Sequence, residues 1–204
     1  MKFTAKRRMP PPTRTQWVLR VSQYLLFGVG ILALGYFGFT LLDAWVYQAK
    51  AERSLENQIH LQQEHKVSYS KPATKEGDVL GRIEIPRLGM SVAVLQGTSS
   101  RILRLGAGHI EGTALPGETG NTGIAGHRDT FFRALKGIRP DDEIQLQTAT
   151  ELLRYKVDWV KVVAPNDVGV LAPSTESTLT LVTCYPFYYI GAAPKRFIVH
   201  AQKY

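Results

Sequence analysis

The stretch TLTLVTCYPFYYIGAAPKRFIVHAQKY, residues 178–204, holds the only cysteine of the chain, Cys184. Residues 178–183 alternate β-branched and leucine side chains, a pattern typical of a buried or half-buried strand. Pro186 cannot donate to a strand ladder, so this strand should end close to Cys184. The sequence therefore predicts a thiol at a strand end.

A second strand should follow over residues 196–203, after a loop rich in proline and glycine. Side chains on a strand alternate between its two faces, so Arg196, Ile198 and His200 share one face of the second strand. Cys184 lies on one face of the first strand with Thr180. If the two strands are neighbours, the thiol and the guanidinium of Arg196 can meet across them.

Positive charge is concentrated at the N-terminus. Residues 1–20 carry six Lys and Arg side chains and no acid, whereas the other residues carry nineteen bases and seventeen acids. A nucleic-acid-binding domain needs bases clustered on a folded surface with interleaved aromatic side chains. The nearly neutral remainder predicts no nucleic-acid partner, and residues 1–20 predict a basic arm without periodic structure.

An uncharged segment follows the arm. Residues 21–42 are rich in Leu, Phe, Ile, Val, Gly and Ala, and a helix of this length spans about 33 Å, enough for a hydrocarbon core of about 30 Å. We expect a transmembrane signal anchor over residues 21–47. A cleaved signal peptide is the alternative, but the residues after the apolar run, Asp43-Ala-Trp-Val-Tyr, are bulky rather than small.

The charge distribution predicts the orientation of this anchor. Basic residues stay on the cytoplasmic side, so the N-terminus should be cytoplasmic and the rest of the chain extracytoplasmic, at the cell membrane. Residues 48–76 come next and predict a helical stalk, rich in Ala, Glu, Gln, Leu and Lys, that ends in a linker.

A lone cysteine has two readings. It can be a small buried hydrophobic side chain, since free cysteine is among the most buried residue types. In an exported domain, an unpaired cysteine is also a candidate reactive thiol. Position alone leaves both readings open.

The remainder of the chain predicts an all-β barrel or sandwich, because short strand-like segments alternate with Gly, Pro and acidic turns. Residues 100–105 and 130–135 predict short helices, the second with Asp129 as a possible cap. The loop 164–177 is longer than a tight hairpin requires, which is typical of a functional loop. The expected strands are residues 79–85, 91–95, 109–110, 122–126, 143–148, 152–163, 178–184 and 196–202.

Two motifs resemble the sortase family. The sequence TLVTC at 180–184, with Arg196 twelve residues after Cys184, is similar to the active-site strand pair of sortases, above all of class D. Residues 114–132, ALPGETGNTGIAGHRDTFF, are similar to the sortase strand that ends in the catalytic histidine, here His127. The motifs stand in family order, and the resemblance covers residues 77–204. It implies an eight-stranded sortase-type β-barrel with short helices as the catalytic domain.

The resemblance also implies an activity, that of a cysteine transpeptidase. Cys184 would attack a sorting signal of the LPXTG type after its threonine, His127 would protonate the leaving amine, and Arg196 would stabilise the oxyanion. An amine from a cell-wall precursor or a pilin would resolve the thioester. Such an enzyme attaches proteins to the cell surface and needs no cofactor.

Further residues are assigned to substrate binding. Next to the catalytic residues stand Thr183, Ala125 and Tyr185, and the loop 164–177 contributes Val168 and Leu171. His109 could support the site, whereas His200 lies four residues from Arg196 along its strand. Acidic residues are scattered and no Cys/His cluster has zinc spacing, so we expect no metal.

Rival readings remain. An L,D-type transpeptidase carries its arginine two residues after the cysteine, where this chain has Pro186. A papain-like peptidase has its histidine well after the cysteine, which leaves only His200 here. The rival from another class is a membrane-anchored β-barrel binding or structural protein in which Cys184 is inert.

Overall fold

The computed structural model describes residues 17, 20, 22–39, 42, 46, 50, 53, 74–189 and 191–204. The chain divides into two compact units, Met1–Asp43 and Ala44–Tyr204, and each is described by itself. The predicted arm (1–20) and the predicted stalk and linker (48–76) lie almost wholly outside the described residues, so these boundaries stay predictions.

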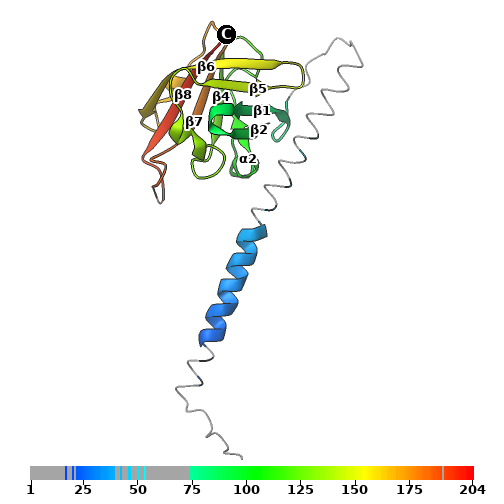
Figure 1. Ribbon diagram of the computed structural model, residues 1–204, viewed down its shortest axis with the longest axis vertical. Helices are drawn as coiled ribbons and strands as arrows, with labels where there is room; N and C mark the ends of the chain where they lie inside the picture. Colours follow the sequence, from blue (N-terminus) through cyan, green and yellow to red (C-terminus); the bar gives the residue numbers. More distant parts are fainter. Residues whose placement is uncertain are drawn as a thin grey trace, which may run out of the picture. The chain divides into compact units, whose positions relative to one another are not determined.

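The first unit contains an apolar helix, Ser22–Phe39, drawn in blue in Figure 1. By length and composition this helix is able to cross a membrane. Its large apolar side chains are exposed; Leu32, for example, is 75% exposed. Contiguous exposed apolar surface of this kind marks a membrane or protein contact. The helix therefore suggests membrane anchoring, as predicted for this segment.

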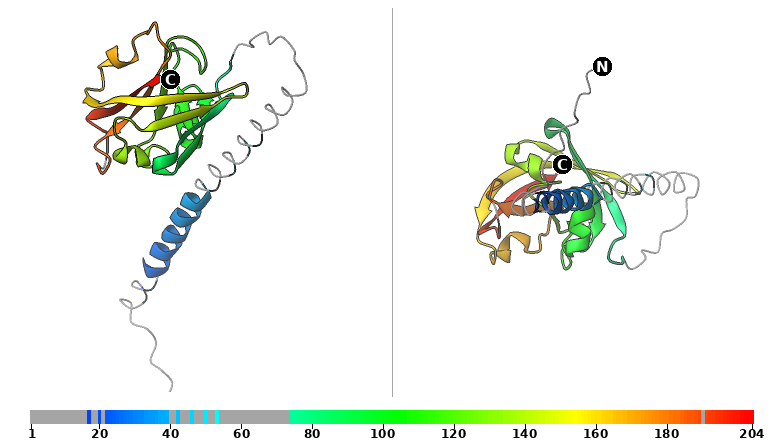
Figure 2. Two further views of the ribbon diagram at one scale, coloured as in Figure 1. Left: turned by 45° about the horizontal axis from the view of Figure 1, so that its top comes forward. Right: turned by 90° about the horizontal axis from the view of Figure 1, so that it is seen from below.

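The second unit is a closed barrel of eight strands, which confirms the predicted all-β fold. Around the barrel the strands follow the order β1-β2-β3-β4-β7-β8-β6-β5 (Figures 1 and 2). Two of the neighbouring pairs, β2 with β3 and β4 with β7, are parallel, and the others are antiparallel. The strands are β1 (Val79–Ile85), β2 (Met90–Gln96), β3 (Ala107–His109), β4 (Asn121–Gly126), β5 (Glu143–Gln147), β6 (Leu152–Val163), β7 (Thr178–Tyr185) and β8 (Lys195–Lys203).

Four short helices connect the strands. They are η1 (Pro86–Leu88), α2 (Ser100–Leu105), η2 (Arg133–Gly137) and η3 (Val168–Leu171), and all but α2 are 3-10 helices. The predicted helix over 100–105 is confirmed, with the Ser99 side chain accepting from the Ile102 amide. The predicted cap at Asp129 is wrong, because η2 begins after Phe132 and no side chain caps it.

Alternation along the strands separates an inner face from an outer one. Leu179 and Leu181 of β7, Ile124 of β4, and Val199 and Ala201 of β8 belong to the main core cluster and are fully buried. Their neighbours along each strand therefore point outward. This alternation fixes which side chains of β4, β7 and β8 share the outer surface.

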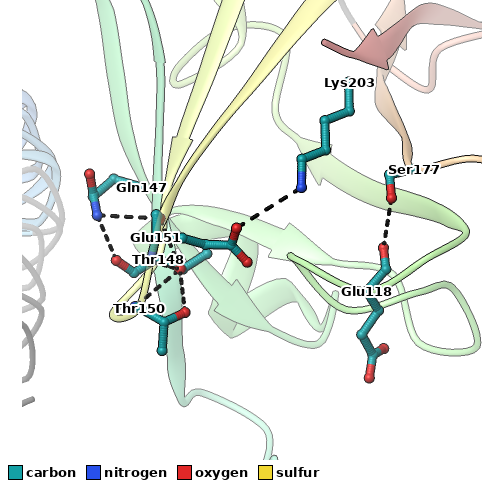
Figure 3. A network of polar contacts seen from close by, with 7 residues as sticks. All are labelled: Glu118, Gln147, Thr148, Thr150, Glu151, Ser177 and Lys203. Carbon is teal, nitrogen blue, oxygen red and sulfur yellow. Dashed lines mark hydrogen bonds and ion pairs between the residues drawn. The ribbon is translucent and has the colours of Figure 1, made fainter. Parts of the chain in front are cut away.

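Polar contacts hold the β5–β6 turn and join it to the end of β8 (Figure 3). The Thr148 hydroxyl accepts from the Thr150 and Glu151 amides at 3.2 and 3.0 Å. Lys203, at the end of β8, lies 4.0 Å from a Glu151 carboxylate oxygen. Since β8 ends here, Arg196 at its other end lies on the opposite side of the barrel.

Candidate active site

Three strands bring the candidate catalytic residues together. Cys184 of β7 lies directly opposite Arg196 of β8 in the antiparallel register, and such partners have Cβ atoms about 4.5–5.5 Å apart. β4 runs parallel to β7 with Gly126 beside Thr183, so the residues that follow, His127 and Cys184, are neighbours at the strand ends. By alternation Cys184 and Arg196 point to the outer face of the barrel, and His127 is the first residue after β4.

The position of His127 depends on the two residues that flank its turn. Phe132 is fully buried, and its ring lies so close to Gly126 that an added Cβ would stand 2.7 Å from it. The Phe132 amide donates to the His127 carbonyl at 3.0 Å. Only glycine permits this packing at the end of β4, and the packed ring in turn holds the backbone of His127.

Thr183 connects the ends of β7 and β4 through a hydrogen bond on the inner face of the barrel. Its hydroxyl donates to the Gly126 carbonyl at 2.7 Å and its side chain is buried. Both partners stand one residue before a candidate catalytic residue. This bond therefore fixes the spacing between His127 and Cys184, whatever contact Thr183 makes with a substrate.

Cys184 and Arg196 are both half-buried, so they are accessible at the surface. The Arg196 guanidinium donates to the carbonyls of Lys195 at 3.0 Å and of Ala193 at 3.3 Å. It is thus held against the last residues of the β7–β8 loop, beside the cysteine. A thiol, an imidazole and a guanidinium at neighbouring strand ends are groups that can act as a nucleophile, a proton donor and an oxyanion donor.

Three of the residues assigned to substrate binding lie on or near the outer face. Ala125 is two residues before His127 on β4, beside Val182 of β7. Leu171 of η3 packs over β4, where a Cβ on Gly123 would meet its Cδ2 at 2.9 Å. Val168, at the other end of η3, is 71% exposed. Whether they bind substrate stays a prediction.

Tyr185 lies elsewhere. It follows Cys184, so alternation turns it to the opposite face of β7. Its ring packs near Phe187 and Phe197, at centroid distances of 6.1 and 6.2 Å, and both phenylalanines contact the main core. The structure therefore does not bring Tyr185 onto the face that carries Cys184.

The other two histidines of the barrel are also placed apart from Cys184. His109 is buried, and its Nδ1 and Nε2 lie 3.0 Å from the Gln96 Oε1 and the Ala114 carbonyl oxygen. Burial lowers the pKa of His109, although the hydrogen bond to Ala114 opposes the shift. His109 therefore supports the β3–β4 connection rather than the cysteine.

His200 is on the outer face, but four residues along β8 from Arg196. Its ring stacks on Trp159 at 4.8 Å, and its Nδ1 lies 3.4 Å from an Asp158 carboxylate oxygen without hydrogen-bond geometry. Burial lowers the pKa of His200, and Asp158 opposes that shift. Among the described residues, no group of three or more His, Cys, Asp or Glu side chains is arranged to hold a metal ion.

Sequence reasoning missed two residues that hold the loops around the site. The Asn121 side-chain amide donates to the carbonyls of Val170 and Ala172 in the β6–β7 loop. Arg128 donates to the carbonyls of Tyr189 and Gly191 in the β7–β8 loop. The only signal was position: Arg128 directly follows His127, and Asn121 opens the same strand.

Comparison with known proteins identifies the family. The sortase domain family model matches residues 83–204. Sortase D of Bacillus subtilis is 29% identical over 197 residues, covering 90% of this chain and 98% of that protein. Among solved structures, a Clostridium perfringens Sortase D5 transpeptidase aligns with a TM-score of 0.62 at 29% identity, covering 78% of this chain and 96% of that one.

A sortase C from Clostridium perfringens is also similar, with 30% identity and a TM-score of 0.59 over 76% of this chain and 90% of that one. Both structural neighbours share the barrel, so the predicted sortase-type fold is confirmed. The chain belongs to the sortase family of cysteine transpeptidases, and it is a homologue of the class D members.

Proposed function

We propose that this sortase cleaves an LPXTG-type sorting signal and transfers the released acyl group to an amine, so that proteins become attached to the cell surface. Cys184 is the nucleophile, His127 the general acid and base, and Arg196 the oxyanion donor. The observation that supports the proposal is the register of β4, β7 and β8, which sets Cys184 opposite Arg196 and pairs Gly126 with Thr183, the residues directly before His127 and Cys184.

The reaction proceeds in two steps. The Cys184 sulfur attacks the threonine carbonyl carbon, and the negative charge that develops on the carbonyl oxygen is stabilised by the Arg196 guanidinium. The C–N bond breaks as His127 gives its proton to the leaving amine, which leaves a thioester on Cys184. An incoming amine then attacks the thioester while His127 takes its proton, and the C–S bond breaks to regenerate the Cys184 thiolate and the protonated His127 with which the cycle began.

Substrate binding would use the outer surface of β4 and β7 together with the β6–β7 loop. Ala125 and Leu171 are apolar and partly exposed on this side, and Val168 is exposed at the start of η3. Thr183 would act indirectly, through its bond to Gly126. Tyr185 would act only through the aromatic cluster at the base of the β7–β8 loop.

The proposed partners are sorting-signal proteins on the donor side and a cell-wall precursor or a pilin as the amine acceptor. We further propose that the helix Ser22–Phe39 anchors the enzyme in the cell membrane, with the N-terminus cytoplasmic and the barrel extracytoplasmic. The six bases of residues 1–20 support this orientation, because basic flanks remain on the cytoplasmic side. A nucleic-acid partner is not part of the proposal.

The test is transpeptidation by the full-length chain in detergent, with a quenched LPXTG peptide library and a panel of amines. Cys184→Ala should abolish acyl-enzyme formation, and His127→Ala and Arg196→Ala should each lower kcat/KM by about a hundredfold or more. His200→Ala, on the same strand as Arg196, is the control and should retain activity. Unchanged cleavage by Cys184→Ala would overturn the proposal.

The rival role for Cys184, an inert side chain in a binding protein, predicts a different outcome. An enclosed cysteine resists a small alkylating reagent, whereas a half-buried nucleophile reacts and the protein loses activity. The partial exposure of Cys184 supports the second outcome. Alkylation of the native protein followed by mass spectrometry distinguishes the two.

A further inference from the structure

The β7–β8 loop connects two of the proposed catalytic residues, Cys184 and Arg196. Figures 1 and 2 show this connection extending beyond the strand ends. Gly191 has a positive φ of 99°, a conformation that favours glycine. A loop of this kind needs external contacts to hold one conformation, and they come from a residue next to His127.

Arg128 supplies these contacts. Its Nη2 donates to the Tyr189 carbonyl at 2.6 Å and to the Gly191 carbonyl at 3.1 Å. Its guanidinium carbon lies 5.8 Å from the centre of the Tyr189 ring, within cation–π range. One guanidinium therefore holds two carbonyls and one ring of the same loop.

The guanidinium is partly enclosed by the loop. Its Nη1 is shielded from solvent and has no hydrogen-bond partner among the described residues. The shielded Nη1 shows that part of the guanidinium lies against the protein, whereas the two bonds of Nη2 lie at the surface. Arg128 is thus a structured contact rather than a solvated surface charge.

The same loop holds the catalytic arginine. Arg196 donates to the Ala193 carbonyl, two residues beyond the Gly191 carbonyl to which Arg128 donates. A continuous path therefore runs from His127 through Arg128 and the loop to Arg196, which lies opposite Cys184. Loosening the loop would release one of the two carbonyls that restrain the Arg196 guanidinium.

We propose that Arg128 is a positioning residue of the active site, which acts through the β7–β8 loop to hold Arg196 beside Cys184. The proposal rests on the proposed function of Arg196 and adds a residue to it. Arg128 does not touch the reacting atoms. Its loss should slow the chemical step and leave substrate binding intact, because misplacement of an oxyanion donor weakens transition-state stabilisation.

Charge alone does not account for this role. Arg133 carries the same charge on the neighbouring η2, but its side chain has no hydrogen bond to the described residues of the loop and acts on Tyr188 through its charge. Among the described residues of the loop, Lys136 contacts Tyr188, with its amino group 3.0 Å from the hydroxyl and 5.6 Å from the ring centre. A lysine at position 128 would keep the charge but lose the planar fork of arginine. Arg133→Gln and Arg128→Lys are therefore matched controls for charge and geometry.

The experiment measures peptide acylation by the full-length chain in detergent. Arg128→Met should lower kcat by about 10- to 30-fold with little change in KM, and Arg128→Lys should lower it by about 3- to 5-fold. Arg133→Gln should change kcat by less than about twofold. Equal losses in Arg128→Met and Arg133→Gln would overturn the proposal, as would a loss confined to KM.

A double-mutant cycle with Arg196→Lys separates positioning from general structural damage. If Arg128 acts through Arg196, Arg128→Met should cost less than about threefold once Arg196 is already replaced. Additive losses would overturn the proposal. If Arg128→Met fails to fold, the cycle with Arg128→Lys decides in the same way.

Hydrogen exchange of residues 186–196 distinguishes failure of this proposal from failure of the proposed function. A wild-type protein without peptidase activity would contradict the proposed substrate, but faster exchange of this segment in Arg128→Met would still support positioning by Arg128. Wild-type activity together with unchanged exchange in Arg128→Met would overturn the positioning role alone.

Discussion

The loops on either side of the candidate site are held in a similar way but in different surroundings. In the β6–β7 loop, residues 164–177, the Asn121 Nδ2 donates to two carbonyls at 3.1 and 3.2 Å. In the β7–β8 loop, residues 186–194, the Arg128 Nη2 donates to two carbonyls at 2.6 and 3.1 Å. One side-chain nitrogen and two backbone oxygens form each clamp.

The environments of the two clamps differ. Asn121 is only 5% exposed, and its Oδ1 accepts from the fully buried Thr180 hydroxyl at 2.8 Å. The β7–β8 loop instead carries exposed aromatic rings, Tyr188 at 76% and Tyr189 at 48%. Buried polar groups that lose their partners cost far more free energy than exposed ones, which water satisfies.

The comparison shows that two clamps with the same number of hydrogen bonds should contribute differently to the free energy of unfolding. The Asn121 clamp should contribute to the stability of the whole barrel, since it is part of the packed surface of β4 and β7. The Arg128 clamp should contribute mainly to local order. The proposed substrate side is then fixed by folding, while the side of Arg196 is held by contacts at the surface.

The largest effect should come from breaking the buried clamp. Asn121→Leu removes the side-chain donor to the Val170 and Ala172 carbonyls and leaves the Thr180 hydroxyl with only its long 3.5 Å contact to the Val170 carbonyl. We therefore expect a loss of about 2–4 kcal/mol in the free energy of unfolding. Urea denaturation measures it. The control is Asn166→Leu, an exposed residue of the same loop, which should change stability by less than about 0.5 kcal/mol. Equal effects of both variants would contradict the comparison.

A smaller loss in the free energy of unfolding should occur when the pH is lowered, because of His109. Burial lowers its pKa in the folded protein, against the opposing effects of the Ala114 carbonyl, Glu118 and Glu111. Between that lowered pKa and the unfolded value of about 6.5, the unfolded chain binds more protons, so stability falls as pH falls through this window. Urea unfolding at a series of pH values measures the loss.

The pH dependence from His109 arises in the same part of the barrel as the Asn121 clamp. His109 contacts the Ala114 carbonyl, and the Ala114 amide donates to the Asn121 carbonyl at 3.0 Å. His109→Gln should therefore reduce the pH dependence, and the lowered pKa of His200 contributes to what remains. An unchanged slope in His109→Gln would assign the effect to other groups.

Breaking the exposed clamp should affect global stability less. For Arg128→Met we expect a change below about 1 kcal/mol in the free energy of unfolding, because the loop carbonyls it releases are solvated. The measurement is urea denaturation beside the Asn121→Leu variant. Arg133→Met is the control for loss of a charge. If Arg128→Met lowers the free energy of unfolding as much as Asn121→Leu does, the two clamps do not differ in their contribution to global stability.

Much of the barrel could be predicted from sequence because strand periodicity is local. The expected strands at 79–85 and 152–163 match β1 and β6 residue for residue. The three proposed catalytic residues were also within reach, since each stands in a short motif at a strand end. Alternation alone would have placed Tyr185 on the face opposite Cys184. The assignment of Tyr185 to substrate binding followed instead from its position next to Cys184 in the motif.

The clamps could not be predicted, because their partners are distant in the chain. Asn121 donates to carbonyls 49 and 51 residues away, and Arg128 to carbonyls 61 and 63 residues away. Backbone carbonyls carry no sequence signal. The wrong cap at Asp129 has a related cause: packing of Phe132 against Gly126 shapes this turn, rather than local capping.

The smallest effect should come from the tip of the exposed loop, where Lys136 contacts Tyr188. The Lys136 amino group donates to the Tyr188 hydroxyl at 3.0 Å and lies 5.6 Å from the ring centre. The hydrogen bond and the charge of Lys136, together with Arg133, lower the pKa of Tyr188. Lys136→Met should therefore raise that pKa without a measurable change in global stability.

Ultraviolet titration of the tyrosines would detect this shift, with Tyr188→Phe used to assign the signal. Lys195→Met is the control, since Lys195 is another exposed base at the end of the same loop. The shift in the pKa of Tyr188 should shrink as salt is added, because exposed charges are screened. A titration that is unchanged by Lys136→Met would mean that the tip of the loop is not held by this contact, and that Arg128 alone orders the exposed side of the site.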